Sequence, residues 1–242
     1  MNEDSLIDYL AKYNGFEKDY KNLFPNKEET IRLLMNVTLP NDLDKDFFKL
    51  EQSFIKGMNS RIELISPKKL DFNDGIVFIK HDPLSIDGDI LLNMSLYDLF
   101  APQDVMRKNI NDDIVFHGGL EIRKDLLGEI AKQNHSIEAW EKHITDGYAL
   151  PYKKIIHVSF KNKLETEDDI KSFSATILDC FKEFKTLRGK TIVVPLFDRE
   201  SNEIEHLLRI CKSYLRTTYS SLKLIFVTNS DELYNKYLPL FD

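Results

Sequence analysis

The strongest constraint on the fold is the alternation of apolar strands with helical segments in the second half of the chain. Residues 191–197 and 222–228 form nearly continuous apolar runs, and residues 154–160 form a third short strand pattern. Residues 166–187, 201–219 and 230–240 instead carry apolar side chains at spacings of three and four, which is typical of helices. Strands that are apolar on both sides need cover on both faces, so the pattern predicts an α/β/α sandwich.

The first 60 residues follow a different pattern, which is helical throughout. Apolar side chains recur at helical spacing within residues 6–13, 31–37 and 43–55. From residue 61 the period changes, and β-branched runs at residues 62–65 and 76–79 predict strands separated by turn-forming residues. We therefore expect residues 1–60 to form a helical extension packed on the core, and residues 61–242 to form the α/β/α domain.

Composition narrows the class of protein. The formal net charge is -7 and no block of five basic residues occurs, which argues against a nucleic-acid partner. The acidic N-terminal residues run into no apolar segment of the kind that a signal peptide contains, and no run of 18 apolar residues occurs anywhere in the sequence. We therefore expect a cytoplasmic protein without a membrane segment. Cys180 and Cys211 lie in helical patterns without nearby histidine spacing, and this predicts buried structural thiols rather than a zinc site.

Four segments in the middle of the chain carry a family pattern in order and spacing. They are residues 77–86, with Asp82 near their centre, and residues 89–95, 110–123 and 144–158. The second reads Asp-Ile-Leu-Leu-Asn-Met-Ser and the fourth begins Ile-Thr-Asp-Gly-Tyr-Ala-Leu-Pro. Together they resemble the G-D-I-T, D-A-I-V-N-A-A-N, I-D-N-x-I-H-x-x-A-G-x-x-L-R and I-T-x-G-Y-x-L-P motifs of macrodomains. The resemblance implies a macrodomain-like α/β/α sandwich with a mixed sheet and a site for ADP-ribose.

Residues 33–40 and 47–55 resemble the helical extension that precedes the fold in zinc-containing macrodomains, which are protein-ADP-ribose hydrolases. The metal ligands of that group lie in a C-F-x-P-x-H-x-C-I-D-N run. Counting back from Ile110 places Pro102, Arg107 and Asn109 at the ligand positions. None of these offers a thiolate, an imidazole or a carboxylate, so we expect no zinc and no other cofactor.

Glycine is missing where the family holds phosphates. The two corresponding loops are residues 96–102, Leu-Tyr-Asp-Leu-Phe-Ala-Pro, and residues 196–202, Leu-Phe-Asp-Arg-Glu-Ser-Asn. Glycine permits close backbone approach to a pyrophosphate and the positive φ angles that aim successive N–H groups at it. The resemblance therefore implies a macrodomain scaffold with an altered ligand site.

The resemblance also implies which residues would contact a ligand. Asp82 would accept a hydrogen bond from an adenine amino group, although a strand-end aspartate can equally cap the following turn. Arg199 could replace lost backbone donors with its guanidinium, or belong to an ordinary charged loop. The full set of candidate ligand-binding residues is Asp82, Pro83, Asn93, Ser95, Gly119, Phe197, Asp198 and Arg199.

Two histidines, His117 and His157, can be considered as catalytic residues, and we assign neither of them a catalytic role. His117 follows Asp112 and Asp113 at helical spacing, which permits a general-base pair but is also typical of a solvated helical turn. His157 lies between apolar residues of a strand and is expected to be a packed histidine.

Three functions fit these features. The first is a non-catalytic module that binds ADP-ribose, a related nucleotide or an ADP-ribosylated protein. The second is an active protein-ADP-ribosyl hydrolase whose metal-free site is rebuilt from side chains such as Asp82, Asn93, Asp98 and Arg199. The third is an interaction scaffold without a nucleotide, in which Leu96, Phe100 and Phe197 fill the former cleft.

Overall fold

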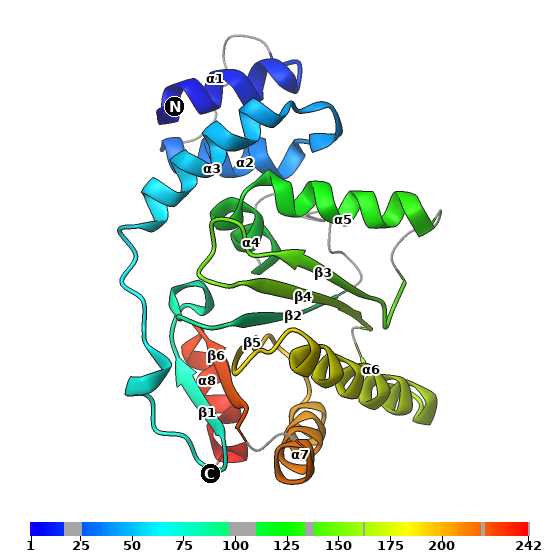
Figure 1. Ribbon diagram of the computed structural model, residues 1–242. Coiled ribbons are helices and arrows are strands. Elements are labelled where there is room, and N and C mark those ends of the chain that lie inside the picture. The colour runs from blue at the N-terminus through cyan, green and yellow to red at the C-terminus, as the bar shows by residue number, and fades with distance from the viewer. Residues whose placement is uncertain (17–25, 97–109, 134–137, 162, 219–220, 242) are drawn as a thin grey trace. The chain divides into compact units, whose positions relative to one another are not determined.

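The computed structural model describes residues 1–16, 26–96, 110–133, 138–161, 163–218 and 221–241 (Figure 1). The chain divides into two compact units. The first contains residues 1–63, 100–135 and 147–150, and the second contains residues 64–99, 136–146 and 151–242. Each unit has its own apolar core. The boundary expected after residue 60 stays a prediction.

The first unit is built from helices. They are α1 (Glu3–Tyr13), α2 (Lys27–Val37), α3 (Lys45–Asn59), α4 (Ile110–Gly118) and α5 (Leu120–Gln133), with a short 3-10 turn η2 (Pro40–Asp42). The first three begin at side chains that accept the backbone N–H three residues on, from Asn2, Asn26 and Asp44. Their apolar faces meet around Leu10, Leu34 and Ile55, which are buried together with Phe116 and Leu120 of α4 and α5.

The second unit contains a six-stranded mixed sheet. Its strands are β1 (Ile76–Lys80), β2 (Ile90–Leu96), β3 (Lys142–Asp146), β4 (Lys154–Phe160), β5 (Thr191–Pro195) and β6 (Lys223–Thr228). Their order is β1-β6-β5-β2-β4-β3. The β3 strand is antiparallel to β4, and all other neighbours are parallel.

Three helices supply the core on one face of this sheet: α6 (Glu167–Thr186), α7 (Ser201–Thr217) and α8 (Asp231–Tyr237). Alternate strand residues such as Leu92, Val158 and Phe226 pack against Phe181 and Leu207 of these helices. The short turns are η3 (Pro67–Lys69), η4 (Pro83–Ser85) and η5 (Leu238–Leu240). Among the described residues, none of the helices is both long and apolar enough to cross a membrane.

The sequence located most of these elements, with three differences. Residues 62–65 form no strand, because only Ile65 pairs, through a single bridge to Ile86. Strand β3 was missed, since its buried positions are the polar His143 and Thr145. The motif segment at residues 110–123 spans two helices, α4 and α5, which separate at Gly119 with a φ of 99°.

Candidate functional site

Five parallel strands of the second unit end at the same edge of the sheet, and the direction of the connections reverses there. The strands β5 and β2 are neighbours at the centre of the sheet. From β5 the chain continues outward to β6 on one side, and β2 pairs with β4 on the other side. Ligands of open α/β sheets bind outside the carboxyl ends of the strands at such a switch point. The ends of β5 and β2 therefore define the candidate site.

The β2 side of this site is described only in part. The backbone of β2 extends to Leu96. The side chains of Ser95 and Leu96 and all of residues 97–109 lie outside the described residues. That range includes the first glycine-free loop and several positions named above, which are Asp98, Phe100, Pro102, Arg107 and Asn109.

The β5 side is the loop between β5 and α7, and Arg199 is buried within it. Its guanidinium donates to Glu203 Oε2 at 2.9 Å and to the Lys161 carbonyl at 3.0 Å. The two side chains of this ion pair are only 3% and 6% exposed. Arg199 also lies 4.7 Å from the ring centre of Phe197. The guanidinium thus ties α7 to the segment after β4, an arrangement that sequence reasoning did not foresee.

Side chains of helix α8 form hydrogen bonds with the backbone of the same loop. The Arg199 N–H donates to the Tyr237 hydroxyl at 2.7 Å, and Lys236 donates to the Arg199 carbonyl at 2.6 Å. Lys236 also pairs with Asp198, whose side chain is 79% exposed. The Arg199 N–H is therefore occupied by a hydrogen bond within the protein. The exposed side chain of this loop is the Asp198 carboxylate, which would repel an anion.

The backbone angles of this loop differ from those of an anion cradle. Such a cradle alternates right-handed and left-handed residues so that successive N–H groups converge. None of residues 196–200, all of which are described, has a positive φ. The absence of glycine noted in the sequence thus corresponds to a loop without left-handed residues.

Asp82 follows β1 and caps the turn η4. Its Oδ1 accepts the Leu84 N–H at 3.0 Å, and its carboxylate is exposed. Pro83 is buried, and its carbonyl accepts a hydrogen bond from the buried Tyr152 hydroxyl. Burial, and then the charges of Asp82 and Asp87, raise the pKa of Tyr152 well above its usual value. The capping role expected as one alternative is present, and the turn contacts β5.

Asn93 lies on β2 in a buried polar row on the sheet face away from α6, α7 and α8. It pairs in register with His157, which in turn pairs with His143. Asn93 Nδ2 lies 3.3 Å from His157 Nδ1, and Thr145 Oγ1 lies 3.0 Å from His157 Nε2. Burial, and then His143, lower the pKa of His157 to about 3. His157 is therefore packed, as the sequence predicted, and its lowered pKa keeps it neutral.

Gly119 belongs to the first unit, whereas the other candidate residues belong to the second. It joins α4 to α5 with a φ of 99°. A Cβ there would overlap the Gln52 amide, which donates to the Gly118 carbonyl at 2.8 Å. These contacts give Gly119 a structural role at the helix junction.

Gly119→Ala is expected to destabilise the first unit by about 1–3 kcal/mol, because alanine disfavours the left-handed region and would displace Gln52. Gly128→Ala is the matched control, since Gly128 lies within α5 and its added Cβ would meet nothing within 4 Å. That control should raise stability by roughly 0.5–1 kcal/mol. Urea unfolding followed by circular dichroism measures the stability of both variants. Equal changes in stability would contradict a structural role for Gly119.

In the described part of the chain, His117 contacts Asn59 of α3. Its Nδ1 lies 2.9 Å from Asn59 Oδ1, and Asn59 also donates to the His117 carbonyl. Asp113 instead accepts from Arg32 at 2.5 Å. This helical surface is a packing contact between α3 and α4.

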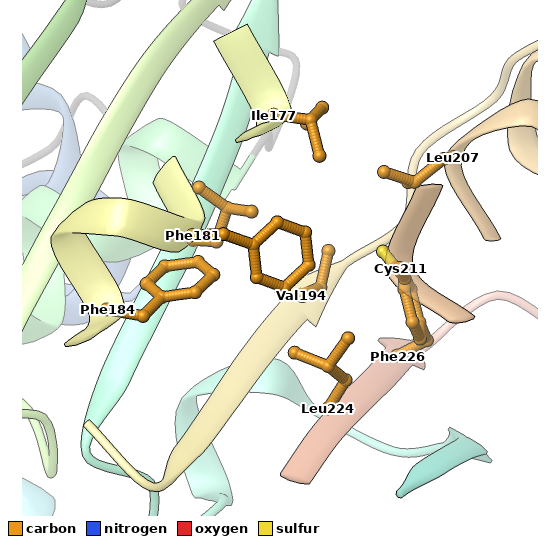
Figure 2. A pocket seen from close by; sticks show the side chains of 9 residues that line it. Ile177, Phe181, Phe184, Val194, Leu207, Cys211, Leu224 and Phe226 are labelled. Atoms are coloured by element: carbon orange, nitrogen blue, oxygen red, sulfur yellow. The ribbon is translucent and has the colours of Figure 1, made fainter. Parts of the chain in front are cut away.

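A small cavity in the second unit is apolar. Its volume is about 10 Å³, and Figure 2 shows its lining side chains pointing inward from the sheet and from α6 and α7. The lining residues are Leu92, Ile177, Phe181, Phe184, Val194, Leu207, Cys211, Leu224 and Phe226. The cavity is about the size of one water molecule, and its lining is apolar apart from the Cys211 thiol, so it is a packing defect and no ligand site.

Comparisons with known proteins agree with this architecture. A family model described as Macro domain matches residues 104–203. The structure resembles a Trypanosoma brucei macrodomain in complex with ADP-ribose, with a TM-score of 0.58, 14% identity, and coverage of 85% of this chain and 93% of that one. It also resembles an Oceanobacillus iheyensis macrodomain with ADP, with a TM-score of 0.59, 17% identity, and coverage of 71% and 92%.

The macro domain of ganglioside induced differentiation associated protein 2 gives a TM-score of 0.54 at 17% identity, over 74% of this chain and 96% of that one. No curated protein matches the sequence. The chain thus has the α/β macrodomain fold, which confirms the resemblance to macrodomains and the fold class predicted from the sequence. The likeness to the zinc-containing group stays a prediction.

Proposed function

We propose that this chain is a non-catalytic macrodomain module that binds ADP-ribose or a related nucleotide, free or attached to a protein. The observation that carries the proposal is the switch point between β5 and β2 in a macrodomain fold. Two macrodomains with similar structures were solved with ADP-ribose and with ADP. The exposed Asp82 carboxylate, on the turn that contacts β5, offers an acceptor for a base amino group.

Several chemically capable side chains of the second unit are engaged in packing, which supports a binding role over a catalytic one. The guanidinium of Arg199 is held by Glu203. Burial raises the pKa of the Cys180 thiol to about 12 and also raises that of Cys211, so both thiols stay protonated. His157 is neutral and buried.

The hydrolase alternative needs a site rebuilt from Asp82, Asn93, Asp98 and Arg199. Two of these, Asn93 and Arg199, are only 1% and 7% exposed. A ligand could meet them only after local rearrangement. The scaffold alternative relies partly on Phe197, which is half-buried and packs against the core that α6, α7 and α8 share with the sheet.

The first test is calorimetric titration of the protein with ADP-ribose, with ADP and AMP as comparators. We expect a micromolar dissociation constant for ADP-ribose, which is on the order of -8 kcal/mol. Asp82→Asn should weaken binding about tenfold, because the amide keeps the Oδ1 cap on Leu84 but replaces the second acceptor by a donor.

Asp71→Asn is the matched control. It makes the same charge change at an exposed aspartate that precedes β1, and it should leave affinity unchanged. No heat with any nucleotide at millimolar concentration would overturn the proposal and favour the scaffold. Release of ADP-ribose from an ADP-ribosylated protein, above the rate without this chain, would favour the hydrolase.

A further inference from the structure

Two donors that the loop between β5 and α7 could offer to a phosphate are already occupied. The Arg199 N–H is bonded to the Tyr237 hydroxyl, and the Arg199 guanidinium is bonded to Glu203 and to the Lys161 carbonyl. None of residues 196–200, all of which are described, has a positive φ. The loop therefore lacks the alternation of handedness that makes successive N–H groups converge on an anion.

Helix α7 begins directly after this loop, and the N-terminus of a helix ordinarily favours an anion. Here acids already lie at that position. Glu200 is the exposed N-cap residue, and Glu203 lies in the first turn. These carboxylates complement the helix dipole themselves, so the N-terminus of α7 gives a phosphate little attraction.

Lys236 of α8 is a cation that reaches the same loop, and Asp198 holds it. Lys236 Nζ donates to Asp198 Oδ1 at 2.7 Å and to the Arg199 carbonyl at 2.6 Å. The Lys236 side chain is 36% exposed, whereas that of Asp198 is 79% exposed. A ligand that approaches this loop from solvent therefore meets mainly the carboxylate of the pair.

The edge of the sheet at which the parallel strands end is acidic. The end of β1 and the segments after β4, β5 and β6 contain ten acidic and five basic residues, within residues 80–85, 161–169, 196–203 and 229–236. Residues 97–109, which follow β2 in the sequence, contain two acidic and two basic residues and leave this balance unchanged. A field of this sign opposes an anionic ligand and has little effect on a neutral one.

Most of the basic residues at this edge are engaged by acids. Four of the five form ion pairs, which are Lys80–Asp231, Lys161–Asp169, Arg199–Glu203 and Lys236–Asp198. The fifth, Lys163, is exposed in a segment that also carries the exposed Glu165 and Glu167. The one histidine there, His81, accepts the Asp82 N–H through Nδ1 at 2.7 Å. A phosphate would have to compete with carboxylates for every one of these cations.

The neutral part of a nucleotide is better served at this edge. The Asp82 carboxylate is exposed, and only one of its oxygens is needed to cap the Leu84 N–H. An ionised carboxylate is purely an acceptor, and the amino group of adenine and the hydroxyls of ribose are donors. The edge thus offers hydrogen bonds to a nucleoside and repulsion to its phosphates.

We propose that the switch point takes a nucleoside in preference to a nucleoside diphosphate, and that Asp198 sets this preference through its own charge and through its hold on Lys236. The inference rests on the proposed function, because it concerns the same site. ADP-ribose binds there through its adenosine part, and its pyrophosphate lowers the affinity.

Calorimetric titration of the chain with adenosine, ADP and ADP-ribose measures the order of affinity. Adenosine should bind at least about threefold more tightly than ADP or ADP-ribose, because two phosphates meet the acidic edge. Added salt should strengthen the binding of ADP and leave that of adenosine unchanged, since it screens the repulsion. A site that attracts phosphate would give the opposite order and the opposite dependence on salt.

Asp198→Asn should tighten the binding of ADP and ADP-ribose about three- to tenfold and leave that of adenosine unchanged, because it removes one negative charge and releases Lys236. Asp146→Asn is the matched control. Asp146 is 57% exposed and pairs with Lys154 at 2.6 Å, but it lies beside the first residue of β4, at the opposite edge of the sheet. It should leave all three affinities unchanged.

The outcomes separate this inference from the proposed function. Binding of ADP or ADP-ribose as tight as that of adenosine, or tighter, would overturn the inference and leave the proposed function standing. So would an Asp198→Asn variant that binds ADP as the parent does. No heat with any of the three ligands at millimolar concentration would overturn the proposed function and this inference with it.

Discussion

Replacing Arg199 by methionine is expected to lower the free energy of unfolding of the second unit by about 3–5 kcal/mol, because it strands a buried charge. The Glu203 side chain is 6% exposed, and among the described residues it would keep only the Leu164 N–H, at 2.8 Å, of its present partners. The Lys161 carbonyl would also lose the Arg199 donor. Methionine fills a similar volume, so the loss reports mainly on charge and hydrogen bonding.

Urea unfolding followed by tryptophan fluorescence measures this effect. Trp140 is the only tryptophan, and it packs edge-on against Phe160 at 5.7 Å in the second unit. Arg209→Met is the matched control, because Arg209 is exposed on α7, the helix that carries Glu203. It should change stability by less than about 0.5 kcal/mol. A similar effect of the two substitutions would contradict a structural role for the buried ion pair.

The double substitution Arg199→Met with Glu203→Leu separates charge burial from packing. Replacing a buried ion pair by apolar residues of similar size is often neutral or stabilising. The double variant should therefore recover most of the stability that Arg199→Met loses. If it recovers and still binds nucleotide as the parent does, Arg199 is a structural residue. If binding alone is lost, the guanidinium reaches the ligand after a rearrangement.

The sequence predicted the strands whose buried side chains are apolar, and it did not predict the strand whose buried side chains are polar. Strands β4, β5 and β6 were found because their hydrophobic runs continue through both faces. Strand β3 was missed because His143 and Thr145 are buried at polar positions, and their partners come from β4 through tertiary pairing. The run at residues 62–65 has strand-like composition but no neighbouring strand to complete a ladder.

The candidate ligand-binding residues stay a prediction, and the sequence did not indicate the direction of the Arg199 side chain. The β5–α7 loop, which lacks glycine, has no positive φ among residues 196–200. The inward turn of Arg199 depends on Lys161 and Tyr237, each 38 residues away along the chain. The only local signal was the spacing of four between Arg199 and Glu203, which permits a helical ion pair.

Glu51 of α3 is expected to give the first unit a strong pH dependence. Its side chain is fully buried, and its Oε1 accepts the Leu120 N–H at 3.1 Å at the start of α5. Burial raises the pKa of Glu51 from 4.5 to about 8, partly offset by the Leu120 hydrogen bond and reinforced by Glu121. The folded protein therefore holds a proton on this carboxyl at neutral pH, whereas the unfolded chain releases it.

The direction of the effect follows from this difference in proton binding. A raised acid pKa gives stability that is fully present below pH 4.5 and is lost as the pH rises to about 8. The loss approaches about 1.4 kcal/mol per pH unit for one proton, which amounts to several kcal/mol across the window. Glu51→Gln removes the titration and keeps an oxygen acceptor for Leu120. It should match the parent near pH 4.5 and exceed it by several kcal/mol at pH 9.

Urea unfolding followed by circular dichroism at pH 5, 7 and 9 tests this prediction through the difference between variant and parent, which cancels the other titrating groups. Glu63→Gln is the control, because Glu63 is exposed in the same unit and should leave the pH profile unchanged. Parallel profiles for the parent and Glu51→Gln would mean that Glu51 is ionised in the folded state. In that case the buried carboxylate must have a cationic or donor partner beyond the Leu120 N–H, since burial alone would otherwise keep it neutral.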